Sequence, residues 1–260
     1  MIAVSVRKLR KSFGTGFSLY IEELVVNRGT VVGLVGPNGS GKSTVVHVCT
    51  GILPPCEGTI ELCGINLGQE PVAAKAIMGV VPEGLGLFDQ LRGREHLHFV
   101  GRIYGLGREE VAQRATDLFT ILEFEDSADK FIHTYSSGTK RKLAFAASII
   151  HQPSLLFLDE PFEGVDPVCA VTMKSILARM NSHGTTVVVT SHNLDLVEKM
   201  CSEVAILSGG RIVFRGTMGD VRQRVKDAVT LETYASLEEI FLDIMSNNGR
   251  EMRRETPSWI

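Results

Sequence analysis

A loop composed almost entirely of small residues separates an apolar segment from a lysine. It reads GPNGSGKS from Gly36 to Ser43 and matches the spacing GxxxxGK[ST] at every fixed position. Gly36, Gly39 and Gly41 can adopt positive φ and leave room for a ligand against the main chain, so that backbone N–H groups surround an anion. Lys42 would contact the β and γ phosphates of that ligand, and the Ser43 hydroxyl would bind the Mg²⁺ that bridges them. The loop therefore predicts a phosphate-binding site.

Two carboxylates and a histidine follow apolar segments in the second half of the chain. Asp159 and Glu160 end the segment LLFLDE, and His192 ends VVVTSH. Ligands bind beyond the carboxyl ends of strands in open α/β sheets, so these side chains are expected beside the phosphate loop. Asp159 would hold Mg²⁺ directly or through water, and Glu160 would act as general base or orient the attacking water. His192 would hydrogen-bond the γ phosphate. The alternative interpretation of the two carboxylates is an acidic turn that follows a strand and has no role in binding.

The hydrophobic pattern outlines the elements that must position these residues. Continuous apolar segments before Gly36, Asp159 and Ser191 predict buried parallel strands, and a helix is expected from Lys42. Alternating apolar residues predict antiparallel strands with one buried face; they are Ile2, Val4 and Val6, then Phe17, Leu19 and Ile21. Helices are expected from about residue 93 to residue 150, and a hairpin turn at Gly209 and Gly210. The pattern indicates an α/β fold with a mixed sheet, an antiparallel β subdomain and a helical insert at about residues 90–150.

The end of the chain carries one more helix signal. Ser236 and Glu239 form a capping box. The apolar residues that follow at helical spacing are Leu237, Ile240, Phe241 and Ile244. We therefore divide the chain into a main domain, residues 1–225, and a tail, residues 226–260, that contains one amphipathic helix.

Composition excludes several classes of protein. The chain has 260 residues, 44% of them hydrophobic and 22% charged, with a formal net charge of -3. That charge argues against a nucleic-acid binder that works through a broad basic surface. No apolar segment approaches the roughly 18 residues that span a bilayer, and the N-terminal segment lacks an apolar signal core, so we expect a cytoplasmic protein. The five cysteines form no CxxC pair and are interpreted as reduced thiols.

Taken together, the motifs resemble those of one family. The chain resembles the nucleotide-binding subunits of ATP-binding cassette (ABC) transporters, from its start to about residue 225. Besides the features above, it has YSSGTKRKL at residues 135–143, at the place of the family signature LSGGQ. It also has EGVD at residues 163–166, at the place of the loop that follows the catalytic glutamate. The resemblance implies a P-loop NTPase core of the ABC ATPase type, ATP and Mg²⁺ as ligands, and hydrolysis of ATP.

The resemblance assigns further site residues. Phe13 matches the aromatic residue that stacks on adenine, and the signature at a helix N-terminus binds the γ phosphate of ATP held by a second cassette. The implied nucleotide-binding residues are Phe13, Gly36, Pro37, Asn38, Gly39, Ser40, Gly41, Lys42, Ser43, Thr44, Ser136, Ser137, Gly138 and Asp166. The catalytic candidates are Lys42, Glu160 and His192. The candidate metal ligands are Ser43, Glu83 and Asp159.

Two departures from the family pattern concern the site. Glu83 stands where the family usually has glutamine, which keeps a metal or water ligand but adds negative charge near Glu160. In the signature, Ser137 replaces the first glycine and Thr139 replaces glutamine. These replacements bear on how tightly the signature face binds ATP. If the second cassette is not identical, one composite site would be weaker than the other.

The resemblance also implies two protein partners. A second cassette, identical or not, would close head to tail around two ATP molecules and separate after hydrolysis, with Asp166 at the contact. An integral membrane permease would dock near Glu83 to Arg94 and hold the chain on the cytoplasmic face of the membrane. Four apolar residues there either line that groove or pack the insert against the core: Leu85, Leu87, Phe88 and Leu91. No nucleic-acid partner is expected.

Three functions fit these observations. The first is an ATP-hydrolysing subunit that powers a membrane transporter, and the SLEEIFLDI segment resembles the end of cassettes that serve exporters. The second is a soluble cassette ATPase acting on ribosomes or DNA, although such relatives usually carry two cassettes or a long coiled-coil insertion. The third is a regulatory subunit that binds ATP with weak hydrolysis. Glu160 and His192 favour the first over the third.

Overall fold

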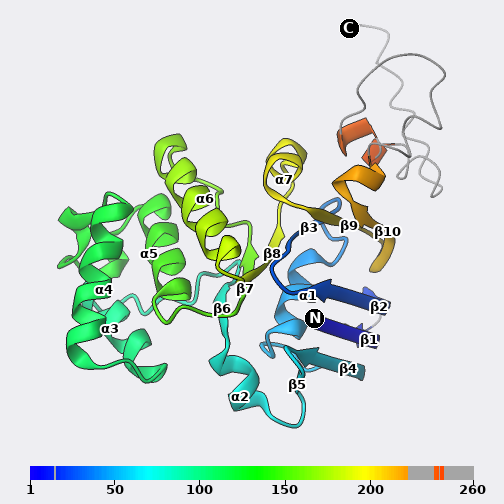
Figure 1. Ribbon diagram of the computed structural model, residues 1–260, viewed down its shortest axis with the longest axis horizontal. Coiled ribbons are helices and arrows are strands. Elements are labelled where there is room, and N and C mark those ends of the chain that lie inside the picture. Colours follow the sequence, from blue (N-terminus) through cyan, green and yellow to red (C-terminus); the bar gives the residue numbers. More distant parts are fainter. Residues whose placement is uncertain (15, 222–236, 240, 243–260) are drawn as a thin grey trace, which may run out of the picture.

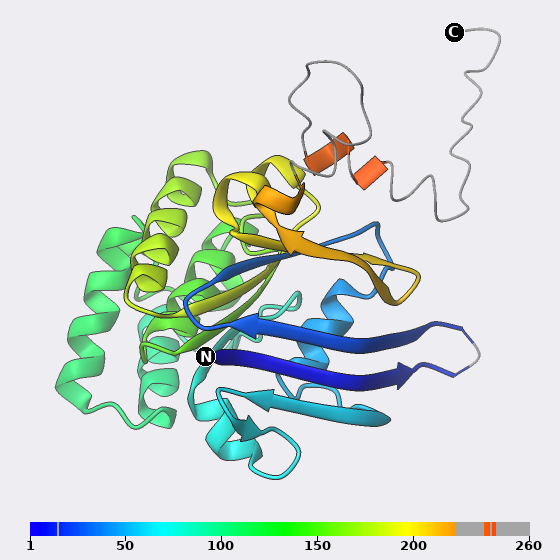
Figure 2. The same ribbon diagram turned by 45° about the vertical axis from the view of Figure 1, so that its right-hand side comes forward.

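The fold is described from a computed structural model, which describes residues 1–14, 16–221, 237–239 and 241–242 (Figure 1). Figures 1 and 2 show helices α3 to α6 gathered at one end of the molecule and an antiparallel sheet at the other. Between them lies a second sheet, whose strands lead to the candidate site.

The larger sheet has six strands in the order β10-β9-β3-β8-β7-β6. Their bounds are β3 Val31–Val35, β6 Met78–Val81, β7 Leu155–Asp159, β8 Thr186–Thr190, β9 Glu203–Ser208 and β10 Arg211–Thr217. The pairs formed by β6, β7, β8, β3 and β9 are parallel, and β9 pairs with β10 in antiparallel fashion. Gly209 and Gly210 form the β9–β10 turn, both at positive φ, which a type I′ turn requires. The predicted mixed sheet and hairpin are confirmed.

The smaller sheet is antiparallel, in the order β2-β1-β4-β5. Its strands are β1 Ile2–Ser12, β2 Ser18–Asn27, β4 Glu57–Leu62 and β5 Ile65–Asn66. The prediction of one buried face is wrong for the start of β1, where Ile2 is exposed while Ala3 and Ser5 are buried beside Val4. The reason is that β1 lies between β2 and β4, so neighbouring strands shield its small side chains on both faces. Phe17 lies just before β2 and is partly exposed.

Helices cover the larger sheet and form the insert. Helix α1, Lys42–Cys49, follows β3 after the phosphate loop, and its buried valines share one hydrophobic core with both sheets. The remaining elements are α2 Pro71–Ala76, α3 Gly93–Ile103, α4 Arg108–Ile121, η1 Glu125–Ser127, η2 Ile132–Thr134, α5 Ser137–Ile149, α6 Pro167–Ser182 and α7 Leu194–Met200. A second core joins helices α3 to α7 to the larger sheet, which confirms the predicted helical insert.

The C-terminal helix falls mostly outside the described residues. Residues 237–239 and 241–242 are helical, and Leu237 is fully buried. The predicted capping residue Ser236 and the apolar positions Ile240 and Ile244 lie outside the described part of the chain. Among the helices that are described, none has the length and apolar character needed to cross a bilayer. All five cysteines are free thiols, as expected.

Candidate active site

The phosphate loop lies between β3 and α1 at the carboxyl edge of the larger sheet. Gly39 and Gly41 adopt φ values of 75° and 107°, in the left-handed region that favours glycine. The prediction of positive φ is wrong for Gly36. Glycine is needed there for lack of space, because a Cβ would lie 2.3 Å from the carbonyl oxygen of Leu207. Asn38 and Gly39 are exposed and Ser40 is buried. The loop thus leaves its main chain open to a ligand on one side.

Lys42 is the first residue of α1 and turns back onto the loop. Its Nζ donates hydrogen bonds to the carbonyl oxygens of Gly36 at 2.8 Å and of Pro37 at 3.3 Å. Burial lowers the pKa of Lys42, while the nearby carboxylates of Glu160, Asp159 and Glu83 act in the opposite direction. Three carboxylates from two segments of the chain therefore act on the ammonium group. Ser43 and Thr44, the next residues of α1, are partly exposed.

Asp159 ends β7 and is 1% exposed. Its Oδ1 accepts a hydrogen bond from the Thr190 hydroxyl, whereas its Oδ2 is buried without a hydrogen-bond partner among the described residues. A buried carboxylate oxygen left unpaired is costly, and a hard divalent cation prefers such oxygen ligands. The free oxygen of Asp159 therefore fits Mg²⁺, as does the hydroxyl of Ser43 at the start of α1.

Glu160 follows β7 in an uncommon backbone conformation, with a φ of 46°. Its N–H donates to the Thr190 hydroxyl oxygen at 3.1 Å, and its Oε1 lies 3.0 Å from His192 Nδ1. The Glu160 side chain is mostly buried, and the His192 side chain is largely exposed. The structure thus brings both catalytic candidates together at the edge of the sheet where Lys42 lies.

Thr190 was not identified from the sequence as a site residue. It is the last residue of β8, pairs with Asp159 across the sheet, and is fully buried. The only sequence signal is a hydroxyl residue directly after the three valines of the strand. Threonine is common in strands, so that signal alone does not distinguish a site residue.

Two aromatic residues, Phe13 and Phe17, lie near the phosphate loop. Phe13 is exposed, and its ring centroid lies 6.3 Å from that of Phe17. A Cβ on Gly41 would lie 2.9 Å from Phe17 Cζ, so the second ring packs directly against the loop. Phe17 is a further aromatic residue at the site that the sequence did not single out, and Phe13 is available to a flat ligand.

The signature segment, residues 135–143, forms the start of α5. Ser136 is the N-cap residue, and its Oγ accepts a hydrogen bond from Thr139 N at 3.1 Å. A Cβ on Gly138 would lie 2.7 Å from the carbonyl oxygen of Gly164, so glycine is required by close approach of the EGVD segment. Ser137 is exposed at the first position of the helix. The helix N-terminus therefore faces outward beside the EGVD segment.

Ion pairs join the signature helix to neighbouring loops. Arg141 binds Glu163 with an Nη2–Oε2 distance of 2.6 Å and also donates to the Glu163 carbonyl oxygen. Lys142 Nζ lies 3.2 Å from Asp166, which also caps α6 by accepting from a backbone N–H at 2.8 Å. The backbone bond and the lysine lower the pKa of Asp166. Asp166 is exposed at the start of α6, beside the signature helix.

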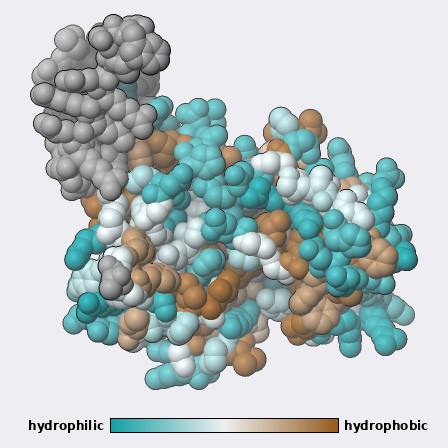
Figure 3. All heavy atoms as spheres, turned by 180° about the vertical axis from the view of Figure 1, so that it is seen from behind, coloured by the Kyte–Doolittle hydropathy of each residue, from teal (hydrophilic) through white to brown (hydrophobic). Residues whose placement is uncertain are grey.

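The segment from Glu83 to Arg94, here called the docking segment, borders a groove of about 430 Å³. Leu85 and Phe88 line this groove, and Leu85, Leu87 and Leu91 pack against the hydrophobic core that includes the insert. The packing reading therefore holds for Leu85, Leu87 and Leu91, and the role of the groove in docking stays a prediction. Glu83 is exposed after β6. Figure 3 shows that hydrophobic residues reach the surface across the middle of the molecule and again toward the helical insert.

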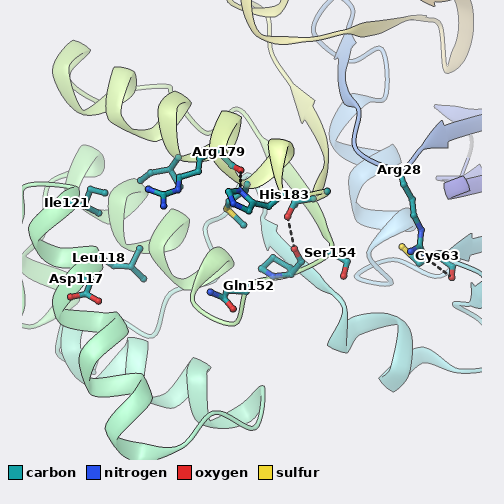
Figure 4. A pocket seen from close by; sticks show the side chains of 14 residues that line it. Arg28, Cys63, Asp117, Leu118, Ile121, Gln152, Ser154, Arg179 and His183 are labelled. Carbon is teal, nitrogen blue, oxygen red and sulfur yellow. Dashed lines mark hydrogen bonds between the residues drawn. The ribbon is translucent and has the colours of Figure 1, made fainter. Parts of the chain in front are cut away.

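A larger crevice, of about 730 Å³, lies away from the phosphate loop (Figure 4). Ser154 precedes β7 and Thr185 precedes β8, so this crevice is at the amino edge of the sheet. Arg28, Arg179 and His183 line it, together with apolar residues of α4 and α6. Because the phosphate loop and the carboxylates all lie at the other edge, we place the active site there and not in the larger crevice.

Known proteins resemble this chain in sequence and in fold. The model of the ABC transporter family matches residues 22–163. A linearmycin resistance ATP-binding protein of Bacillus subtilis (strain 168) is 32% identical over 240 residues, which are 92% of this chain and 77% of that protein. A Nod factor export ATP-binding protein of Cupriavidus metallidurans is 30% identical over 255 residues, 97% of this chain and 84% of that protein. The solved structure of an ATP-binding subunit of an ABC transporter has a TM-score of 0.85 at 28% identity and covers 94% of this chain and 99% of its own.

Proposed function

Because the chain belongs to the ABC transporter family, as an ATP-binding and ATP-hydrolysing subunit, we propose that it powers export through a membrane permease. The observation that supports hydrolysis best is the cluster of Lys42, Asp159, Glu160 and His192 at one edge of the sheet. Two cassettes would close around ATP and separate when hydrolysis removes the γ phosphate contacts between them. This cycle of closing and opening would drive transport. The chain itself would act on the cytoplasmic face of the membrane.

In the proposed site the phosphate loop holds the ATP phosphates. Lys42 would exchange its bonds to loop carbonyls for the β and γ phosphates, which is a small movement of a flexible side chain. Mg²⁺, held by Ser43 and Asp159 with Glu83 nearby, would neutralise charge on the phosphates. The exposed ring of Phe13 would stack on adenine.

Glu160 is the proposed general base. Its carboxylate is mostly buried and lies beside His192, so it can orient or deprotonate the water that attacks the γ phosphate. His192 would hydrogen-bond the γ phosphate and hold the Glu160 carboxylate in place. The loss of that phosphate would then be sensed by the same pair of residues.

The second half of each ATP site would come from another cassette. Ser136, Ser137 and Gly138 lie at an outward-facing helix N-terminus, where backbone N–H groups favour a phosphate. Asp166 caps the adjacent helix and would lie at the contact between the two cassettes. A head-to-tail dimer, of identical or different cassettes, would therefore complete two ATP sites.

The permease is proposed to dock at the groove beside the docking segment. Phe88 is exposed there, and the lining is largely apolar and aromatic, which suits a short amphipathic helix of the partner. Export is favoured over import by the names of the relatives, one of which is an antibiotic resistance protein and the other an export protein. The transported molecule would be selected by the permease.

The test uses the Glu160→Gln variant, which should bind ATP without hydrolysing it and so keep two cassettes closed. We would purify it with ATP from detergent-solubilised membranes of the native host cells and identify the copurified proteins by mass spectrometry. Lys42→Ala, which should not hold ATP, is the control for ATP-dependent recovery. A polytopic membrane protein recovered with both variants supports permease docking, because docking at the groove does not require bound ATP. Ribosomal or DNA-repair proteins in its place would contradict the transporter function.

A further inference from the structure

The register of the sheet places one buried hydroxyl against both Asp159 and Glu160. Thr190 pairs with Asp159 across β7 and β8, and its side chain is 0% exposed. Its Oγ1 donates a hydrogen bond to Asp159 Oδ1 and accepts one from the N–H of Glu160 at 3.1 Å. A hydroxyl has one proton and two lone pairs, so it can make both bonds at once. Thr190 is therefore bonded to the side chain of one site residue and to the backbone of the next.

The first bond decides which oxygen of Asp159 is free. With Oδ1 held by Thr190, the rotation of the carboxylate is set and Oδ2 is left without a hydrogen-bond partner among the described residues. Without the hydroxyl, the carboxylate could rotate, and both oxygens would need another partner. A residue that holds a metal ligand in this way typically contributes strongly to metal affinity.

The second bond holds Glu160 in its left-handed backbone conformation. A φ of 46° is unfavourable for a residue with a Cβ and persists only where the surroundings stabilise it. Asp159 is the last residue of β7 that pairs with β8, so the Glu160 N–H lies beyond the ladder and is bound by the Thr190 hydroxyl. This conformation directs the Glu160 side chain toward His192.

We propose that Thr190 is a positioning residue for ATP hydrolysis, which sets the metal-binding oxygen of Asp159 and the orientation of Glu160 through a single hydroxyl. The inference rests on the hydrolysis proposed above and needs neither the permease nor its substrate. The bond to Asp159 acts on metal binding, and the bond to Glu160 acts on the chemical step. The two effects can therefore be measured separately.

The deciding variants are Thr190→Val, which keeps the shape and loses the hydroxyl, and Thr190→Ser, which keeps the hydroxyl. The matched control is Thr186→Val in the same strand. Thr186 is 1% exposed and its Oγ1 accepts a hydrogen bond from Gly29 N at 3.0 Å, but it lies at the opposite edge of the sheet. The control thus removes an equally buried hydroxyl from the same strand without touching the site.

Steady-state hydrolysis is the first measurement. Thr190→Val should lower kcat by about 10- to 100-fold, with a smaller change in the KM for ATP. The reason is that Glu160 orients the attacking water, which matters for hydrolysis and not for the binding of ATP. Thr190→Ser should recover most of that loss, and Thr186→Val should retain a kcat close to that of the wild type. Equal losses in Thr190→Val and Thr186→Val would overturn the proposal, because they would reflect strand stability alone.

Metal binding is the second measurement and does not depend on turnover. Mn²⁺, as a probe for Mg²⁺, is titrated into each variant with a nonhydrolysable ATP analogue, and bound Mn²⁺ is followed by electron paramagnetic resonance. Thr190→Val should weaken Mn²⁺ binding by about tenfold or more, while Thr190→Ser and Thr186→Val bind as the wild type does. Unchanged Mn²⁺ affinity in Thr190→Val would overturn the role at Asp159. If the wild type does not hydrolyse ATP, the proposed function fails, but the Mn²⁺ titration still decides the role of Thr190.

Discussion

The chain presents two regions that would contact the two different ATP molecules of a cassette dimer, and they are built differently. At the sheet edge, Asp159 and Thr190 are buried and bonded to each other, and Lys42 is nearly buried among carboxylates. At the signature helix, Ser136 and Ser137 are exposed, and the ion pairs nearby are partly open to solvent. The first region is organised by the core, and the second by contacts at the surface.

This difference has a physical consequence for how each region works. Buried strands with a fixed register hold reacting groups within a narrow range of positions, as chemistry requires. A helix N-terminus at the surface can bind or release a phosphate without disturbing the core. We therefore expect substitutions at the sheet edge to abolish chemistry, and substitutions at the signature helix to weaken the association of two cassettes.

The largest expected effect comes from removing the proposed general base. Glu160→Gln should lower the rate of ATP hydrolysis by about 10²- to 10⁴-fold, because the amide cannot accept a proton from the attacking water. Nucleotide binding, measured by fluorescence titration, should be retained. Glu163→Gln, the same exchange on the signature side, is the control and should keep the rate within a few fold. Comparable losses in the two variants would erase the distinction between the regions.

A methyl group at the signature glycine should affect association more than chemistry. Gly138→Ala would place a Cβ 2.7 Å from the Gly164 carbonyl oxygen, so the EGVD segment must move. In the hydrolysis-deficient Glu160→Gln background, we expect ATP-dependent dimerisation to weaken by about tenfold, equivalent to about 1.4 kcal/mol. Sedimentation velocity with ATP measures it. Gly107→Ala, whose Cβ meets no described atom within 4 Å, should dimerise as its parent does, and an unaltered dimer in Gly138→Ala would contradict the assignment.

A smaller effect is expected from the ion pair that ties the signature helix to the EGVD segment. Arg141→Met keeps the length of the side chain and removes its bonds to Glu163, and Arg141 is 14% exposed. The free energy of unfolding in urea should fall by about 1 kcal/mol. Arg94→Met breaks a more open pair with Asp129, at 3.3 Å and with Arg94 40% exposed, and should cost less than about 0.5 kcal/mol. A larger loss of unfolding free energy in Arg94→Met than in Arg141→Met would show that burial does not determine how much these ion pairs stabilise the fold.

A separate effect, confined to acidic pH, concerns stability at the end of the signature helix. Burial lowers the pKa of His151 to about 4, and its Nε2 lies 3.0 Å from the Met78 carbonyl oxygen. An unfolded histidine has a pKa of about 6.5, so the unfolded chain binds more protons between those values, and stability falls as the pH is lowered through that window. In His151→Gln this part of the loss should be absent. Urea unfolding at pH 7 and pH 5 measures the difference, and identical pH dependence in both proteins would refute it.

Much of the fold follows from local pattern. The phosphate loop, its strand and helix, the carboxylates after β7 and the hairpin at Gly209 and Gly210 were predicted because each is encoded within a short segment. The errors arose where packing decides the outcome. The small residues Ala3 and Ser5 are buried because β1 is a central strand, and Gly36 is needed for its close approach to Leu207.

The sequence by itself determined which chemical groups are present and at which ends of strands and helices they stand, because loop spacing and hydrophobic period are local properties. Only the tertiary structure decided which of them meet. The register of β7 against β8 brings Thr190 to Asp159, and the turn at Glu160 brings its carboxylate to His192. Register and side-chain direction depend on how distant segments pack, and no single segment of the chain carries that information.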